Sequence, residues 1–378
     1  MEMGRRSPHR KRMNKIDLRS DTVSWPTPAM REAMANAAVG DDVYGDDPTV
    51  NELQRVAAEI TGMEDALFVT SGTQGNFVAM LAHCGRGQEA IIGDGHHVYT
   101  AEAGNIAQMG SIVPRILPLD SHGQMNLGDI EGSIRFGNEH HPISRLILVE
   151  TTSGGRNGIP LSLDYLAAVR EIADQHGLVV HCDGARLFNA ATALNVPVSE
   201  ITQYVDSVTF CLSKGLCAPI GSVLCGSKDF IRRAHRARKP IGGGLRQAGI
   251  LAAAGLVAIR DIVPRLHEDH HHARMLAEGL ARIPGIDIKV DNVHTNLVFF
   301  GLTEDAEIDA PTVCQRLKDE YDILISARSP RTFRAVTHYW IDANVVETFL
   351  DSMAAVLESA SDEVVVSADT SSPYYQKQ

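Results

Sequence analysis

The sequence predicts an α/β fold, in which helices cover a mostly parallel sheet, followed by a smaller α+β domain. Short apolar runs alternate with helical patterns from about residue 50 to residue 230. These runs are apolar at consecutive positions, as in strands that are buried on both faces. From about residue 261 the pattern changes to a long helix, two alternating stretches and a closing helix.

The elements of the larger part are predicted from their individual patterns. In the segment 51–61, Leu53, Val56, Ala57 and Ile60 fall on one face of a helix. Short runs of apolar residues that end in polar or glycine-containing turns are typical of buried strands. Helices are predicted at 51–61, 75–83 and 163–176, and strands at 66–69, 90–92, 145–149, 178–181, 207–210 and 222–225.

The smaller part is predicted from a helix at 267–283, alternating stretches at 286–290 and 297–300, and a helix at 344–360. We expect the N-terminal segment to complete this domain. The predicted organisation is then a disordered extension (1–15), a large domain (16–260, of which 16–50 is partly an N-terminal arm), a small domain (261–360) and a flexible tail (361–378).

Composition excludes several classes of protein. The formal net charge of the 378 residues is −12, which disfavours binding to nucleic acid or to an anionic membrane. No apolar run approaches the roughly 20 residues of a membrane helix. The six cysteines include no CxxC pair, so we expect free thiols in a reducing cytoplasm. The histidines between 267 and 272 are interpreted as a solvated helix face, and no metal site is predicted.

Asp183 and Lys214 are the most informative pair of residues. Each follows an apolar run, Asp183 in the segment DGAR and Lys214 in the segment FCLSKG. A lysine can hold pyridoxal phosphate as a Schiff base, while a carboxylate keeps the pyridine nitrogen protonated so that the ring accepts electrons. Ligands of parallel sheets lie at the carboxyl ends of the strands, where both residues are predicted.

The segment TSGTQGN (70–76) joins a predicted strand to a predicted helix. Free backbone N–H groups at such a junction bind phosphate, and the side chains of Ser71 and Thr73 add donors beside Gly72. The alternative is ordinary helix capping by Ser71 or Thr73. Three glycines at 242–244 follow Arg236, Arg238 and Lys239, and this basic cluster can reach a phosphate. The alternative is a solvent-facing loop.

Four further side chains suit an amino acid substrate. The imidazole of His97 can stack on a pyridine ring and transfer protons near neutral pH, although His96 is an adjacent alternative. The guanidinium groups of Arg186 and Arg334 can bind a carboxylate at two points, and Ser20 can donate a hydrogen bond. For each arginine the alternative is a surface position or a structural ion pair.

Together the motifs resemble the low-specificity L-threonine aldolase family, within the β-eliminating lyase group of fold-type I pyridoxal phosphate enzymes. The resemblance covers nearly the whole chain, in the family order. It rests on IDLRSDTVSWPTPAM (16–30), GDDVYGDDPTVNEL (40–53), FVTSGTQGN (68–76), HVYTAEAG (97–104), HCDGARLFNA (181–190), FCLSKGLCAPIGSVL (210–224), RKPIGGGLRQAG (238–249) and RAVTHYWI (334–341).

The resemblance implies an aspartate aminotransferase-like large domain with a seven-stranded sheet. It also implies retro-aldol cleavage of a β-hydroxy-α-amino acid, such as threonine, allo-threonine or phenylserine, to glycine and an aldehyde. By the same resemblance the protein is a dimer of dimers whose sites are shared across the dimer contact, and Tyr44 is expected to bind substrate as part of that sharing. The implied roles are a Schiff base at Lys214, a partner for the pyridine nitrogen at Asp183, ring stacking at His97, phosphate binding at Gly72, Thr73 and Arg246, and carboxylate binding at Ser20, Arg186 and Arg334.

One stretch departs from the family pattern. After the central strand, where the family usually reads Glu-Asn-Thr-His-Asn, this chain reads Glu150-Thr151-Thr152-Ser153-Gly154. A second imidazole near the substrate hydroxyl is therefore missing here or is supplied elsewhere. The first candidate for the base is His97, or a water that it holds. A smaller departure is Cys217, where a small residue is usual.

Three other functions stay open on the sequence. Another reaction on the same cofactor, such as β-elimination, decarboxylation or transamination, is the nearest alternative because of Thr151 and Ser153. A catalytically silent binding or assembly subunit is disfavoured by the presence of both Asp183 and Lys214. An NAD enzyme is disfavoured further, since no GxGxxG fingerprint follows a predicted strand.

Overall fold

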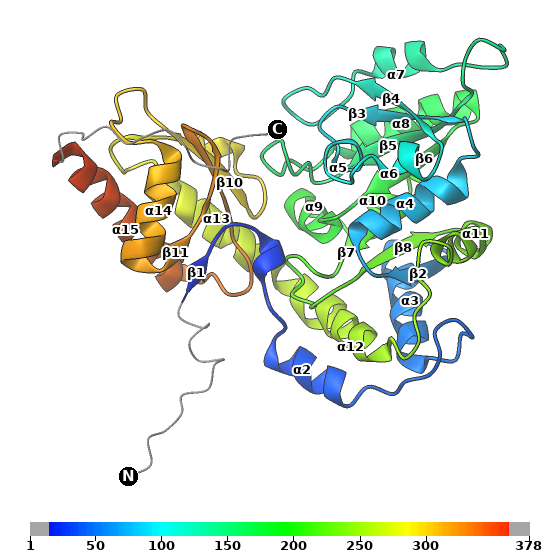
Figure 1. Cartoon of the computed structure of the whole chain (residues 1–378), viewed down its shortest axis with the longest axis horizontal. Coiled ribbons are helices and arrows are strands. Elements are labelled where there is room, and N and C mark those ends of the chain that lie inside the picture. Colours follow the sequence, from blue (N-terminus) through cyan, green and yellow to red (C-terminus); the bar gives the residue numbers. More distant parts are fainter. Residues whose placement is uncertain (1–14, 363–378) are drawn as a thin grey trace.

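The computed structural model describes residues 15–362, and within them the chain forms two parts with separate cores (Figure 1). The larger part contains a seven-stranded sheet in the order β2-β8-β7-β6-β5-β3-β4. Strand β8 runs antiparallel to both of its neighbours, and the other pairs are parallel. The predicted α/β class and mostly parallel sheet are therefore confirmed.

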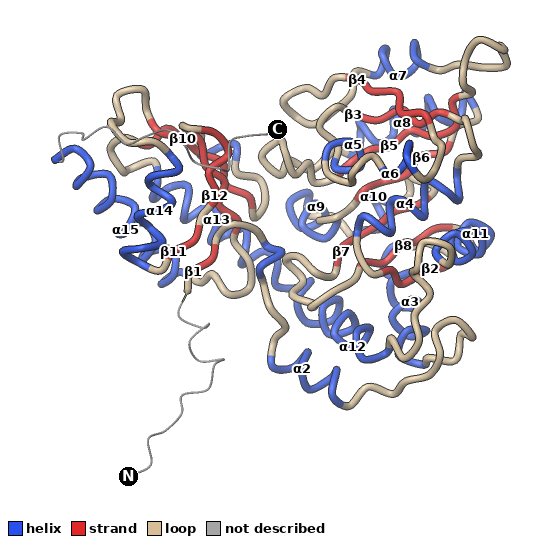
Figure 2. Tube along the Cα trace, in the orientation of Figure 1, coloured by secondary structure: helices blue, strands red, loops and turns tan. Residues whose placement is uncertain are grey.

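Helices lie on both faces of this sheet, as the consecutive burial of its strands requires (Figure 2). The strands are β2 (Asp65–Val69), β3 (Glu89–Gly93), β4 (Val113–Leu117), β5 (Ser144–Glu150), β6 (Val179–Asp183), β7 (Ser207–Cys211) and β8 (Ser222–Gly226). The helices are α2 (Pro28–Ala35), α3 (Pro48–Thr61), α4 (Gly72–His83), α5 (His97–Thr100), α6 (Asn105–Gln108), α7 (Leu127–Ser133), α8 (Leu163–His176), α9 (Leu187–Leu194), α10 (Val198–Thr202), α11 (Lys228–Arg238) and α12 (Gly249–Val257).

Local sequence signals set several helix ends. Helix α3 begins after Asp47, whose carboxylate accepts from the backbone N–H groups of Thr49 and Val50, with Pro48 in the first turn. It ends at Gly62, which takes the left-handed conformation at φ 67°. These signals explain why the predicted helix 51–61 differs from α3 mainly at its start.

The smaller part is built from a four-stranded antiparallel sheet in the order β12-β13-β10-β9 and from helices packed beside it. Its elements are α13 (Leu266–Leu280), β9 (Ile286–Asp287), β10 (Leu297–Leu302), α14 (Ala310–Tyr321), β11 (Ile323–Leu324), β12 (Ser326–Ser329), β13 (Thr332–Val336) and α15 (Ala343–Asp362). The N-terminal β1 (Ile16–Asp17) pairs with β11, and the next residue, Leu18, lies in the core of this part.

After β1 the chain crosses to the larger part through a short 3-10 helix (Asp21–Val23) and α2, which packs on α12. Helix α13 leads back from the larger to the smaller part (Figure 1). Two segments of the chain therefore connect the parts, and both pass beside the carboxyl-terminal edge of the large sheet. The predicted extension 1–15 and tail 361–378 lie almost entirely outside the described residues.

Several elements differ from the expectation, among them β4 and the helix that carries the histidine run. Strand β4 was not predicted, because Pro114 and Arg115 interrupt its apolar run at the edge of the sheet. The histidine run lies on α13, where His267 and His271 are exposed but His270 and His272 are half-buried. Within the described residues, no helix is long and apolar enough to cross a membrane.

Candidate active site

The residues of the candidate site follow five strands of the large sheet that point the same way, with the antiparallel β8 between β2 and β7. Strand β6 ends at Asp183, β7 leads to Lys214, and β3 leads to His97. Strand β2 leads to the turn at Ser71, and β5 ends at Glu150. Because parallel strands end at one edge of a sheet, residues up to 143 positions apart in the chain meet at this edge (71 to 214).

The Asp183 carboxylate is buried and held by hydrogen bonds. Its Oδ2 accepts from the Asn76 Nδ2 at 2.8 Å, and its Oδ1 accepts from the backbone N–H of Ala185 at 3.1 Å. Asn76 donates its other proton to Glu102 Oε1 at 3.0 Å. A buried carboxylate that is bound in this way has a fixed direction, which suits a partner for a protonated ring nitrogen.

His97 lies beside the carboxylates of Asp183 and Glu102. Its Nδ1 lies 2.8 Å from Glu102 Oε1, while about half of the side chain is exposed. The hydrogen bond to Glu102 raises the pKa of His97, burial opposes this, and the charges of Asp183 and Lys214 act in opposite directions. The ligand atoms of His97, Glu102 and Asp183 lie within 4.8 Å of one another, so these three groups face one space. The adjacent His96 turns inward and accepts from the backbone N–H of Gly93.

Glu150, at the end of β5, is a buried carboxylate that binds two backbone segments of the site. Its Oε2 accepts from the backbone N–H of His97 at 2.6 Å and its Oε1 from that of Gly154 at 3.1 Å. Burial, with the nearby charge of Asp183, raises the pKa of Glu150 to about 7. This carboxylate therefore fixes both the His97 turn and the segment that follows β5.

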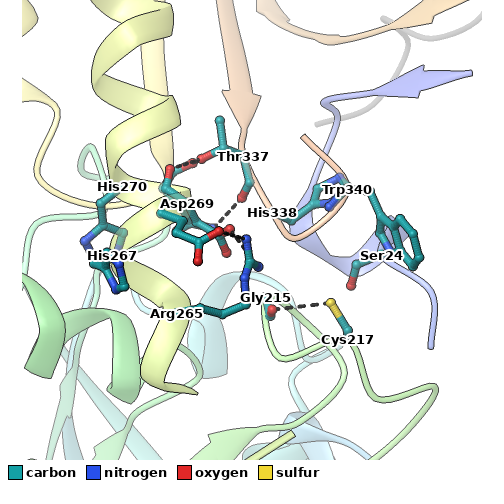
Figure 3. A network of polar contacts seen from close by, with 12 residues as sticks. Ser24, Gly215, Cys217, Arg265, His267, Asp269, His270, Thr337, His338 and Trp340 are labelled. Carbon is teal, nitrogen blue, oxygen red and sulfur yellow. Dashed lines mark hydrogen bonds and ion pairs between the residues drawn. The ribbon is translucent and has the colours of Figure 1, made fainter. Parts of the chain in front are cut away.

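The loop that carries Lys214 is anchored from the N-terminal arm and rests on α13. The Ser24 hydroxyl donates to the Lys214 carbonyl at 2.8 Å. Figure 3 shows Asp269 of α13, and Arg265 just before this helix, beside Gly215 and Cys217 of this loop. Asp269 is fully buried, and burial raises its pKa to about 7 although Arg265 lies 3.5 Å away. The backbone of the lysine is thus fixed by both connections between the two parts.

The two candidate arginines for a carboxylate lie close to one acidic residue, Asp21. Arg186 binds Asp21 at two points, at 2.7 and 2.6 Å, and both side chains are buried. Arg334 donates through Nη2 to the Arg19 carbonyl, and its buried Nε has no partner among the described residues. Burial and the charge of Arg186 lower the pKa of Arg334. Arg186 and Arg334 carry two positive charges and Asp21 one negative charge, so the region around them has a net positive charge that suits a substrate carboxylate.

Ser20 belongs to the same segment, but its hydroxyl is engaged locally. It caps the 3-10 helix by accepting from the Thr22 N–H at 3.2 Å and from the Thr22 hydroxyl at 2.9 Å. The Ser20 hydroxyl donates to Asp21 Oδ1, with 3.5 Å between the two oxygens. Donation from Ser20 to a substrate stays a prediction.

The turn predicted to bind phosphate lies at the start of α4. The Ser71 hydroxyl caps the helix by accepting from the Gln74 N–H at 3.1 Å. A helix leaves its first N–H groups without an intrahelical acceptor, so those at Gly72 and Thr73 are available to an anion. A Cβ on Gly72 would lie 2.9 Å from Cys211 Sγ, which explains the glycine there.

Arg246 and Tyr44 lie together at the surface, joined by Asp41. Arg246 Nη1 lies 2.9 Å from Asp41 Oδ2, and Asp41 Oδ1 accepts from the backbone N–H groups of Val43 and Tyr44. The Tyr44 side chain is 76% exposed. Neither residue is brought to Asp183 within this chain, and their roles stay predictions.

The segment that departs from the family pattern begins beside Asp183, since the Thr151 N–H donates to the Asp183 carbonyl at 2.9 Å, but its side chains contact other residues. Thr151 Oγ1 accepts from the Leu161 N–H at 3.1 Å, and Ser153 packs beside Gly123. Neither hydroxyl replaces an imidazole beside His97.

Four residues of the site were not predicted from the sequence: Asp21, Asn76, Glu102 and Glu150. Glu150 ends a predicted strand as Asp183 does, so its position was an available signal. Asn76 and Asp21 act across 107 and 165 residues of chain, and no local pattern indicates such partners.

The residues present fit pyridoxal phosphate. The fixed Asp183 carboxylate suits the ring nitrogen, the start of α4 suits the phosphate, and Lys214 provides the amine. The unpartnered Arg334 Nε adds a buried donor next to this space. A fold-type I pyridoxal phosphate-dependent enzyme places its functional groups in this way.

Comparison with known proteins agrees with this class. The sequence model of the beta-eliminating lyase family matches residues 17–303. The chain is 45% identical to a probable low-specificity L-threonine aldolase 2 of Arabidopsis thaliana, over 91% of this chain and 98% of that protein. It is 47% identical to the low specificity L-threonine aldolase of Escherichia coli K12, over 85% and 93% respectively.

Solved structures agree in fold. A putative L-allo-threonine aldolase of Listeria monocytogenes superposes with a TM-score of 0.75 at 20% identity, covering 92% of this chain and 97% of that one. The threonine aldolase of Leishmania major gives 0.72 at 18% identity, over 92% and 99%. The chain belongs to the beta-eliminating lyase family, and the resemblance to the threonine aldolases is confirmed.

Proposed function

We propose that this protein cleaves a β-hydroxy-α-amino acid of the threonine type to glycine and an aldehyde, with pyridoxal phosphate as cofactor. The observation that carries the proposal is the placement of His97, whose ring nitrogen lies within 4.8 Å of the Glu102 and Asp183 carboxylates while about half of the side chain is exposed. Relatives that are 45% to 47% identical carry the name low-specificity threonine aldolase.

The cofactor supplies an electron sink for the electron pair of the broken Cα–Cβ bond. Asp183 is the partner of its ring nitrogen, and Lys214 is the amine that holds it. The N–H groups of Gly72 and Thr73, with Arg246, are assigned to its phosphate. Asn76 keeps the Asp183 carboxylate in place, since it donates to Oδ2 at 2.8 Å.

Arg186, Arg334 and Ser20 are assigned to the substrate carboxylate. The positive charge around Asp21 binds this group and fixes the rotation of the substrate, so that the bond to be broken takes one orientation. His97 Nε2, or a water that it holds, removes the proton of the β-hydroxyl. Glu102 stabilises the imidazolium that results, through Nδ1 at 2.8 Å.

Product analysis tests this function. The purified protein is incubated with pyridoxal phosphate and, separately, with threonine, phenylserine, 3-hydroxyaspartate and cysteine. Equal amounts of glycine and aldehyde from the hydroxy amino acids support the proposal. An oxo acid and ammonia in their place would instead establish β-elimination. That second candidate is favoured by Thr151 and Ser153, which leave the β-hydroxyl side without the usual imidazole.

We also infer a dimer of dimers in the cytoplasm. The support is the exposed Tyr44 beside Arg246, whose phosphate role needs a site completed by another chain, and six free cysteines, five of them buried. Light scattering of the wild type and of Tyr44→Asp tests the assembly. A monomeric wild-type protein with full turnover would contradict it.

A further inference from the structure

A chain of buried polar side chains extends from Asp183 to the end of α4. Asn76 Nδ2 donates to Asp183, and Asn76 Oδ1 lies 3.3 Å from His181 Nε2. His181 Nδ1 lies 2.9 Å from Ser207 Oγ, which in turn lies 2.7 Å from His83 Nε2. The three inner members, Asn76, His181 and Ser207, are 1%, 0% and 0% exposed.

The two carboxylates beside Asn76 determine which atoms donate in this chain of hydrogen bonds. Asn76 Nδ2 faces two carboxylate oxygens, on Asp183 and Glu102, so both amide protons are donated there. The amide oxygen has no proton and can only accept. His181 Nε2 must therefore carry a hydrogen and donate it to Asn76 Oδ1.

The directions of the hydrogen bonds among His181, Ser207 and His83 follow from the neutral state of both histidines. Burial lowers the pKa of His181 to about 3, and burial with the charges of Arg233 and Arg145 lowers that of His83 to about 3. A neutral His181 with hydrogen on Nε2 has a lone pair on Nδ1, so Ser207 donates to it. Ser207 Oγ then accepts from His83 Nε2, which carries the hydrogen of that ring.

We propose that His181 and Ser207 are positioning residues that act on Asp183 through Asn76, in a chain in which every hydrogen points toward the Asp183 carboxylate. Hydrogen bonds aligned in one direction polarise one another, and this alignment stabilises negative charge at its end. The chain of hydrogen bonds keeps the Asp183 carboxylate correctly directed for the pyridine nitrogen. The inference rests on the proposed function only for this last step, because the tautomers belong to the protein itself.

Nitrogen NMR of histidine-labelled protein tests the direction of the chain, with the cofactor removed and again with it bound. We expect His181 and His83 to be neutral with hydrogen on Nε2 at all pH values from 5 to 9. Resonances are assigned with His181→Gln and His83→Gln. Hydrogen on Nδ1 of His181, or its titration near pH 6.5, would overturn the proposal, whatever reaction the enzyme catalyses.

Three variants test the effect on Asp183. His181→Phe removes the donor to Asn76, whereas His181→Gln keeps an N–H near the Nε2 position, and Ser207→Ala removes the donor to Nδ1. We expect His181→Phe and Ser207→Ala to lower kcat by roughly tenfold or more, with KM for threonine changed less than about twofold. His181→Gln should recover most of the loss.

Ser352→Ala is the matched control, because Ser352 is also a buried serine but bonds only to its own helix, α15. The dissociation constant of pyridoxal phosphate, measured by fluorescence, is a second readout and should rise in His181→Phe. Equal kcat in all variants and the wild type would refute a positioning role. Absence of glycine release from the wild type, with the expected tautomers, would refute the proposed function alone.

Discussion

The Arg186 guanidinium holds the Asp21 carboxylate at two points, Nε to Oδ2 at 2.7 Å and Nη2 to Oδ1 at 2.6 Å. Burial alone would raise the pKa of Asp21, but Arg186, together with Lys214 and Asn296, holds this pKa well below its usual value. The pair joins the N-terminal segment to the carboxyl-terminal edge of the large sheet. It therefore couples the position of the segment to the charge of the substrate site.

We expect Asp21→Asn to destabilise the fold by about 3 kcal/mol, because a buried guanidinium loses its counter-charge. Urea unfolding of Asp21→Asn, Arg186→Met and the double variant measures the coupling. The double variant should be less destabilised than the sum of the two single changes. Additive effects would show that the pair contributes no interaction energy.

Lys214→Ala should abolish the visible absorbance of bound cofactor and nearly all glycine release, because the amine that holds pyridoxal phosphate is gone. Lys228→Ala, at an exposed lysine of α11, serves as the control and should keep both. A Lys214→Ala protein that retains the absorbance would place the covalent link elsewhere.

Asp183→Ala should lower kcat by a factor of about 100 or more, since the ring nitrogen loses the carboxylate that keeps it protonated. The fold should persist, because the carboxylate bonds only Asn76 and Ala185 among the hydrogen bonds described. Circular dichroism checks the fold and steady-state kinetics the rate. Near-normal turnover in a folded variant would remove Asp183 from the mechanism.

Glu102→Gln should move the acidic limb of the profile of kcat/KM against pH to lower pH. The Glu102 hydrogen bond raises the pKa of His97, and a base acts only when it is deprotonated. Loss of the Glu102 charge lowers that pKa, so His97 becomes active at a lower pH. A limb that stays in place would show that another group is the base.

Asp269→Asn should raise stability at pH 8 by on the order of 1 kcal/mol, with little change at pH 4. Burial raises the folded-state pKa of Asp269 to about 7. Protonated Asp269 contributes its full share to the free energy of unfolding below pH 4. This contribution is lost as the pH rises toward 7, because the buried carboxyl group then ionises. Asparagine does not ionise, so the variant avoids this loss. Urea unfolding between pH 4 and pH 8 measures it, with Asp291→Asn as an exposed control. Equal pH dependence in wild type and Asp269→Asn would contradict the assignment.

Some of the site could be read from local sequence because its residues end apolar runs. Asp183 ends β6 as predicted, and Lys214 follows β7 by three residues. The turn at Gly72 begins α4, where the sequence placed a strand-to-helix junction. Such signals depend on the few residues around them, so no tertiary contact is needed to recognise them.

The chain's sequence by itself determined the α/β class, most buried strands, and the aspartate, lysine and phosphate turn at their ends. Only the tertiary structure decided that β8 runs antiparallel, that Asn76 orients Asp183 and that Asp21 neutralises Arg186. The reason is physical. Periodicity and turn chemistry act over a few residues, whereas a buried charge is paired by whichever segment the packing of the whole chain brings beside it.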